Sequence, residues 1–191
     1  MDSEPKITLE QCRQCDAFFK EILDKAIKNQ NLQISDVAEF YILSLLVAGL
    51  KKGPYENNES IAERYARARL NNELRILRDI GDLSLIISGV YWQSLLRKPV
   101  DVDYYISIGR HAYTLAGESG DSLSELFDEL SEKFTGIVNV LTEATNCIET
   151  STSDVNILRM YEVWLRTRNP FLEQRLRSLG INVIPGKITR Q

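Results

Sequence analysis

The chain has 191 residues, of which 43% are hydrophobic and 26% are charged, and its formal net charge at pH 7 is −4. A chain of this length corresponds to one domain and buries about 70% of its unfolded surface, so it needs neither disulfides nor a structural metal ion to fold. The acidic balance argues against broad nucleic-acid binding, which depends on neutralising phosphates. We therefore expect one domain over residues 1–191.

The chain has three cysteines, and two of them, Cys12 and Cys15, are spaced as Cys-x-x-Cys. The first residues contain neither the basic region nor the apolar core of a secretory signal, so we expect a cytoplasmic protein with reduced thiols. An apolar run covers residues 40–50, which is shorter than the ~18 residues of a membrane-spanning helix. This run predicts a buried helix and no membrane partner.

Helical patterns follow one another along almost the whole chain. They are separated by breaks rich in Gly, Pro, Asn and Ser, and no segment is convincing as a strand. The predicted helices cover residues 8–29, 35–50, 60–79, 83–96, 102–116, 122–147, 154–168 and 170–180. The prediction is an all-α, single-domain bundle of about seven or eight helices, with residues 181–191 as a loose C-terminal tail.

The segment 83–96 is predicted to be the central helix. It contains no charged residue, and its apolar side chains surround the helix on all sides. A helix of this kind is buried on every side. Gly81 and Asp82 are interpreted as the break before it, and residues 37–50, whose one charge is Glu39, as its main neighbour in the core.

The helix predicted at 102–116 suggests either close packing or a ligand slot. Tyr105, Gly109, Ala112 and Ala116 line up as a smooth groove, and small residues at this spacing let a neighbouring helix come close. The functional alternative is a flat-ligand pocket between this helix and helix 83–96, with a histidine as axial ligand to a haem-like tetrapyrrole. The candidate ligand-binding residues are Tyr91, Trp92, Tyr105, Arg110 and His111.

Four arginines share one face of the helix predicted at 60–79. At 3.6 residues per turn, Arg64, Arg67, Arg75 and Arg78 fall within one narrow stripe. Guanidinium groups bind carboxylates and phosphates in a bidentate manner. The stripe is therefore a candidate surface for a protein partner, an anionic ligand or a nucleic-acid backbone, the last being disfavoured by the net charge.

A complementary acidic stripe follows in the helix predicted at 122–147 and the residue before it. Asp121, Glu125, Asp128 and Glu132 are spaced by four, three and four residues, which places them on one helical face. The two stripes could pair within the fold, meet across a homodimer, or serve different partners. Exposed ion pairs add only about 0–1 kcal/mol each, so their usual value lies in specificity.

No pattern in the chain predicts a catalytic or metal centre. The single histidine, His111, does not follow a glutamate by three residues, as a di-iron bundle would require. Cys12 and Cys15 have no strand before them, and the remaining zinc ligands would have to come from distant segments. We therefore name no catalytic residue, no metal ligand and no cofactor.

The leading hypothesis is a non-enzymatic cytoplasmic protein that acts through protein–protein contact, in a regulatory or adaptor role, and associates with itself. Its basis is the sorting of charge into two opposed helical stripes, since mixed surface charge would suffice for solubility. The alternative is a small-ligand binder or sensor that uses the pocket between helices 83–96 and 102–116. A third, weaker hypothesis is binding of nucleic acid or another anionic partner by the arginine stripe.

Overall fold

The computed structural model describes residues 9–52, 60–92, 101–118, 120, 122–150, 154, 157–158, 160–161, 164 and 170–183. Within these ranges the protein is helical, with no strand, as the sequence predicts. The helices are α1 (Leu9–Asn29), α2 (Asp36–Lys52), α3 (Ile61–Leu70), α4 (Leu74–Gly89), α6 (Val102–Gly117), α7 (Ser124–Glu132), α8 (Phe134–Thr150) and α10 (Pro170–Ser178).

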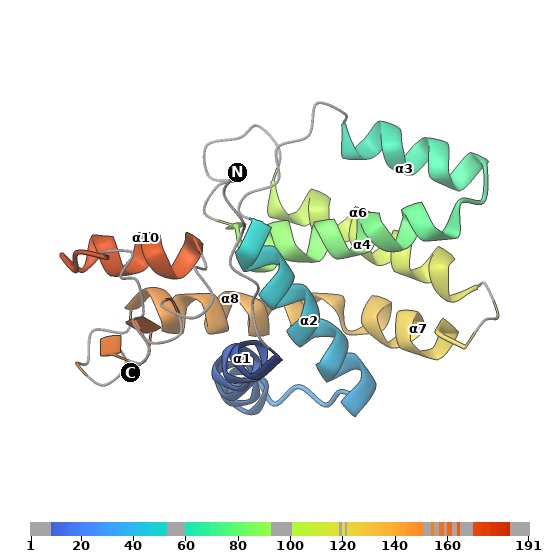
Figure 1. Ribbon diagram of the computed structural model, residues 1–191. Coiled ribbons are helices and arrows are strands. Elements are labelled where there is room, and N and C mark those ends of the chain that lie inside the picture. Colours follow the sequence, from blue (N-terminus) through green and yellow to red (C-terminus); the bar gives the residue numbers. More distant parts are fainter. Residues whose placement is uncertain are drawn as a thin grey trace.

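Helices α4 and α6 form the centre of the bundle (Figure 1). The ring of Tyr113 lies against Gly81, while Gly109 lies against Ser84. Because later residues of α4 meet earlier residues of α6, the two helices run antiparallel. Helix α4 also packs against α2, α3 and α8, whereas α7 and α8 follow each other nearly end to end beneath the central pair.

The central helix has different boundaries from those predicted. The expected helix over 60–79 is wrong, because the chain breaks at residues 71–73, where Asn72 adopts φ +53°. Asparagine tolerates this left-handed conformation better than most residues. The expected break at Gly81 and Asp82 is wrong too, since both lie inside α4. In the apolar half of α4, Leu85 and Ile86 are buried, but Leu83 and Ile87 are only partly buried, and the first half of the helix carries charges. Residues 93–96 of the predicted central helix lie outside the described residues.

Helix α4 contributes to both apolar clusters of the described core. Leu77 and Ile80 pack with Ala68 of α3 and Ala112 of α6, and Leu85 belongs to the main cluster. The main cluster also contains buried residues from α1, α2, α7, α8 and α10. The position of α4 therefore sets where α2, α6 and α7 can lie.

Glycines allow the close contact of α4 with α6. A Cβ atom on Gly81 would lie 2.3 Å from the Tyr113 ring, and one on Gly109 would lie 2.4 Å from Phe134 and 2.7 Å from Ser84. Real Cβ contacts are never this short, so both positions require the absence of a side chain. The expectation that the Gly109 groove serves helix packing is confirmed.

None of the helices in the described ranges has an apolar stretch long enough to span a membrane. The tail predicted at residues 181–191 falls mostly outside the described residues. Of its first three positions, Val183 is buried.

Replacing Gly109 by alanine should lower the free energy of unfolding by about 1–3 kcal/mol, because the new methyl group would overpack the α4–α6 seam. Gly49→Ala is the matched control, since its Cβ would meet only the Ile86 side chain, 3.0 Å from Cδ1 and 3.1 Å from Cγ2, which is a milder contact than those at Gly109. Urea unfolding should show a change within about 1 kcal/mol for this control. Unchanged stability of Gly109→Ala would contradict the close approach of the two helices.

Candidate functional site

The four arginines of the predicted stripe lie on two helices. Arg64 and Arg67 belong to α3, and Arg75 and Arg78 to α4, because the helix breaks between them. Arg64 Nη2 lies 3.5 Å from Asp79 Oδ2 and its side chain is only 17% exposed. The continuous stripe inferred from one straight helix is therefore wrong.

Two of the four arginines, Arg64 and Arg78, make contacts between helices, and the other two are exposed. The guanidinium carbon of Arg78 lies 4.8 Å from the centroid of the Phe127 ring, in a cation–π contact between α4 and α7. Arg64 is engaged with Asp79 across the α3–α4 turn. Arg67 and Arg75 are exposed, on different helices. The arginine surface that remains is thus smaller than the sequence suggested.

The acidic stripe lies on an exposed side of α7, with the carboxylate of Asp128 next to Gly117 of α6. Glu125, Asp128 and Glu132 are all exposed, and none of the three carboxylates forms an ion pair or hydrogen bond within the described part of the chain. Asp121 falls outside the described residues. Pairing of these three carboxylates with the arginines inside one molecule is therefore not found, and their role in binding a partner stays a prediction.

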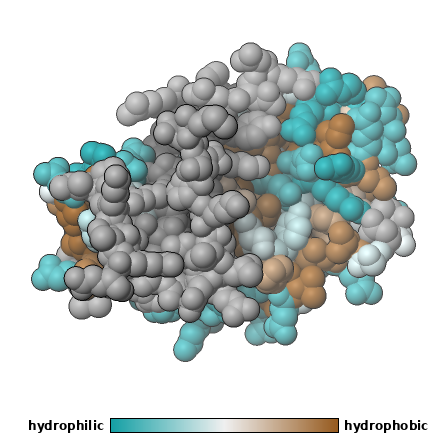
Figure 2. Space-filling view, viewed as in Figure 1, coloured by the Kyte–Doolittle hydropathy of each residue, from teal (hydrophilic) through white to brown (hydrophobic). Residues whose placement is uncertain are grey.

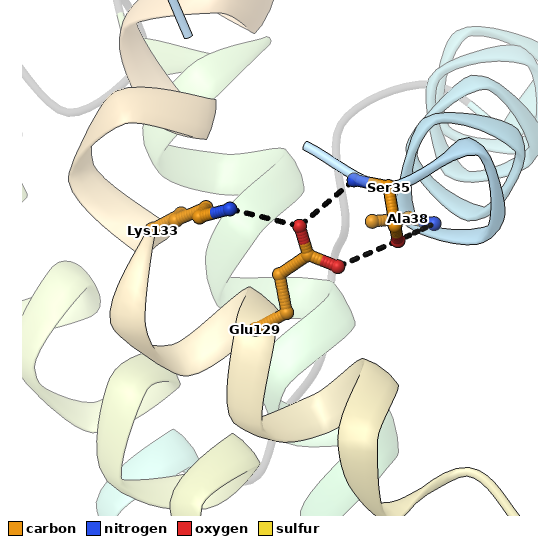
Figure 3. Close-up of polar contacts among 4 residues, drawn as sticks. All are labelled: Ser35, Ala38, Glu129 and Lys133. Atoms are coloured by element: carbon orange, nitrogen blue, oxygen red, sulfur yellow. Dashed lines mark hydrogen bonds and ion pairs between the residues drawn. The ribbon is translucent and has the colours of Figure 1, made fainter. Parts of the chain in front are cut away.

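A fourth acidic side chain of α7 points toward the N-terminus of α2 and holds it (Figure 3). Glu129 accepts hydrogen bonds from the backbone N–H of Ser35 at 2.8 Å and from its hydroxyl at 2.6 Å. Ser35 Oγ in turn accepts from Ala38 N–H at 3.1 Å, as an N-cap does. Lys133 Nζ lies 3.0 Å from the same carboxylate.

The pKa of Glu129 is lowered by these contacts. Partial burial acts in the opposite direction, but the hydrogen bonds from Ser35 and Lys133 outweigh it. The carboxylate is thus held in its charged form at the N-terminus of α2, where the helix dipole also favours a negative charge.

A hydrogen-bonded carboxylate joins α2, α4 and α6. Asp82 Oδ1 accepts from the hydroxyl of Tyr41 at 2.7 Å and from the hydroxyl of Tyr113 at 2.6 Å. Burial raises the pKa of Asp82, although both hydroxyl donors act against this shift. Burial and the nearby Asp82 carboxylate raise the pKa of Tyr41 and Tyr113, so both hydroxyls keep their protons.

Phe127 of α7 completes this cluster. Its ring centroid lies 5.8 Å from that of Tyr41, in an edge-to-face arrangement, and 5.5 Å from that of Tyr113. Arg78 covers the same ring. The four helices α2, α4, α6 and α7 therefore meet around one aromatic ring and one carboxylate.

The five candidate ligand residues have separate surroundings. The Tyr91 hydroxyl donates to the carbonyl oxygen of Gly49 in α2 at 2.9 Å, and Trp92 is partly buried. Tyr105 is partly buried and stacks edge to face on Tyr104, with centroids 5.4 Å apart. Arg110 and His111 are exposed on the outer side of α6.

His111 therefore does not lie in the seam between α4 and α6. Its Nδ1 lies 2.8 Å from the carbonyl oxygen of Ser107, one turn earlier in the same helix. Two surface depressions of about 400 Å³ each are found elsewhere, and neither includes any of the five residues. The flat-ligand hypothesis stays a prediction.

Metal-binding chemistry receives no support within the described residues. They contain no group of three or more His, Cys, Asp or Glu side chains that could hold a metal ion. Cys147 is a free, partly buried thiol. The side chains of Cys12 and Cys15 lie outside the described part of the molecule.

Comparison with models of protein families, with curated proteins and with solved structures finds no match for this chain.

The sequence did not reveal the roles of Asp82 and Glu129. Asp82 was interpreted as part of a break, although it is a single acid between Ile80 and the apolar run that follows. Glu129 lies one helical turn from Leu126 and beside Leu130, both buried, and this flanking position was an available signal. A carboxylate next to an apolar stripe often finds a partner at the edge of the core.

Asp82→Asn and Glu129→Gln should change the pH dependence of stability in opposite directions. Because the pKa of Asp82 in the folded protein lies above the ordinary value of 3.8, the folded state keeps this proton more tightly than the unfolded state. The wild type should therefore lose stability relative to Asp82→Asn as the pH rises above about 3.8. The lowered pKa of Glu129 makes the wild type gain stability relative to Glu129→Gln as pH rises towards and beyond 4.5, reaching about 1 kcal/mol at neutral pH.

Urea unfolding between pH 3 and pH 7.5 measures both differences, each variant serving as the other's control. The account of either carboxylate would be contradicted if both differences changed in the same direction.

Proposed function

We propose that this chain is a non-enzymatic cytoplasmic protein that works by contact with other proteins, including copies of itself, in a regulatory or adaptor role. The observation that carries the proposal is the division of acidic side chains on α7. Glu129 is used to hold α2, whereas Glu125, Asp128 and Glu132 are exposed and form no ion pair or hydrogen bond among the described residues.

Charges of this kind add little to the stability of the fold itself. Solvent-exposed carboxylates gain little from being near one another, and three on one face repel each other slightly. A single-sign surface does, however, speed up and orient the approach of an oppositely charged partner. The outer face of α7 is therefore suited to a basic protein surface.

The rigid attachment of α7 supports this role. Phe127 is anchored by Tyr41, Tyr113 and Arg78, and Phe127 and Leu130 are fully or almost fully buried. An acidic face on a fixed helix loses little conformational freedom when a partner binds. This arrangement favours recognition by surface contact.

Reversing two of these charges should remove the binding of basic partners. In affinity capture with purified protein at about 50 mM salt, proteins retained by the wild type should be lost with the double variant Glu125→Lys/Glu132→Lys. Retention by the wild type itself should fall about tenfold when the salt is raised to about 500 mM, because the contact is screened.

The matched control is Glu63→Lys/Asp103→Lys, which makes the same change of charge at exposed positions on α3 and α6. It should retain the wild-type partners. The proposal fails if the wild type captures no protein and does not associate with itself, or if the α7 variant and the control behave alike.

A further inference from the structure

The outer face of α2 is apolar and exposed. Phe40 is 72% exposed and Val37 is 60% exposed, and Ser44 and Ala48 follow on the same face. Their spacing of three, four and four residues forms one stripe along the helix, with no charge from position 37 to position 48 on that stripe. Figure 2 shows hydrophobic residues at the surface to the right of the grey atoms, interspersed with hydrophilic ones.

We propose that this face binds the same face of a second copy, so that two α2 helices cross antiparallel about a twofold axis at Ser44. The inference rests on the proposed function, since it names one partner and the surface that receives it. In an isologous contact of this kind, each residue before the axis meets a residue after it on the other copy.

The sizes of the side chains match an antiparallel crossing. With Ser44 on the axis, Phe40 of one copy meets Ala48 of the other, each about 6 Å along the helix from the axis at 1.5 Å per residue. The large ring is thus opposite a methyl group, and the small side chain of Ser44 lets the helices approach. A parallel arrangement would place the two Phe40 rings against each other.

The charges at the two ends of α2 match the same arrangement. Asp36 begins the helix and lies about 12 Å before the axis, whereas Lys51 lies one residue before its end and about 10.5 Å after the axis. Antiparallel crossing therefore brings Asp36 of each copy to the level of Lys51 of the other. A parallel crossing would place like charges together.

Covering this face leaves no polar group of Ser44 without a partner. Ser44 Oγ donates to the carbonyl oxygen of Phe40 at 2.9 Å within the same helix. A hydroxyl that is already hydrogen-bonded can be buried at little cost, whereas a free one could not. The nearest acid, Glu39, is paired with Lys20 of α1 and points away from the stripe.

The helix that carries this face is fixed before binding. Glu129 holds its N-terminus, Asp82 binds Tyr41 on its flank, and Tyr91 donates to the backbone of Gly49 near its end. A preformed surface loses little freedom on association. Leu70, by contrast, is 86% exposed at the end of α3 as a single apolar side chain, which needs no partner.

Sedimentation equilibrium of the full chain, from about 1 to about 200 μM, tests the proposal. The wild type should form a dimer, and Ser44→Glu should weaken it at least about 30-fold, because two carboxylates would meet on the axis. Ser44 is exposed in the single chain, so this variant should keep the wild-type circular dichroism spectrum. Leu70→Glu, the matched control, should dimerise within about twofold of the wild type.

Charge exchange tests the antiparallel direction. Asp36→Lys and Lys51→Asp should each weaken the dimer by about 3- to 10-fold, and the double variant Asp36→Lys/Lys51→Asp should recover wild-type affinity within about twofold. Recovery requires that position 36 of one copy faces position 51 of the other. Additive weakening in the double variant would overturn the antiparallel crossing.

The outcomes separate this inference from the proposed function. A strictly monomeric wild type overturns the dimer and the self-association in the proposed function, while salt-dependent capture of basic proteins by α7 would leave its contact with other proteins standing. A wild-type dimer that is unaffected by Ser44→Glu overturns the α2 face but not self-association. Loss of both dimer and capture contradicts both proposals.

Discussion

The contact of Asp82 with two tyrosine hydroxyls constrains the rest of this structure. A carboxylate that leaves water without donors costs several kcal/mol, so Asp82 requires Tyr41 of α2 and Tyr113 of α6 where the helices converge. Gly81, the preceding residue, gives the Tyr113 ring the space to reach this position. Phe127 then closes the cluster from α7, so one site determines how four helices lie.

Helices α2 and α7 each have one side that contacts the rest of the fold and another side that is exposed to solvent. On α7, the carboxylate of Glu129 binds the N-terminus of α2, whereas Glu125 and Glu132 are exposed. On α2, the buried side joins the core, and Tyr41 is bound on the flank, while Phe40 faces solvent. Surfaces held in this way can meet a partner without rearrangement, which supports the proposal that the protein acts by contact.

The sequence predicted the helices whose ends carry strong local signals. The helix predicted at 102–116 is α6, which Asp101 caps by accepting from the N–H of Val102, and the apolar run of α2 is a helix. The break after α3 was missed because Asn71 and Asn72 replace the usual Gly or Pro, and Gly81 was misread because its role depends on a ring 32 residues away. Likewise, Arg64 and Arg78 appeared to share a face only while one straight helix was assumed. These features depend on contacts between helices, and the pattern of apolar and charged residues within one helix cannot reveal such contacts.

Disulfide trapping at the crossing point tests the central claim most directly. Helices that pack 8–10 Å apart bring facing Cα atoms near the axis within the range of about 4.4–6.8 Å that a disulfide requires. Under mild oxidation, Ser44→Cys should give a covalent dimer on a non-reducing gel, well above the background that the native cysteines give in the wild type. Leu70→Cys should stay at that background. Equal cross-linking of the two variants, or none at position 44 in a protein that sediments as a dimer, would contradict the contact through α2.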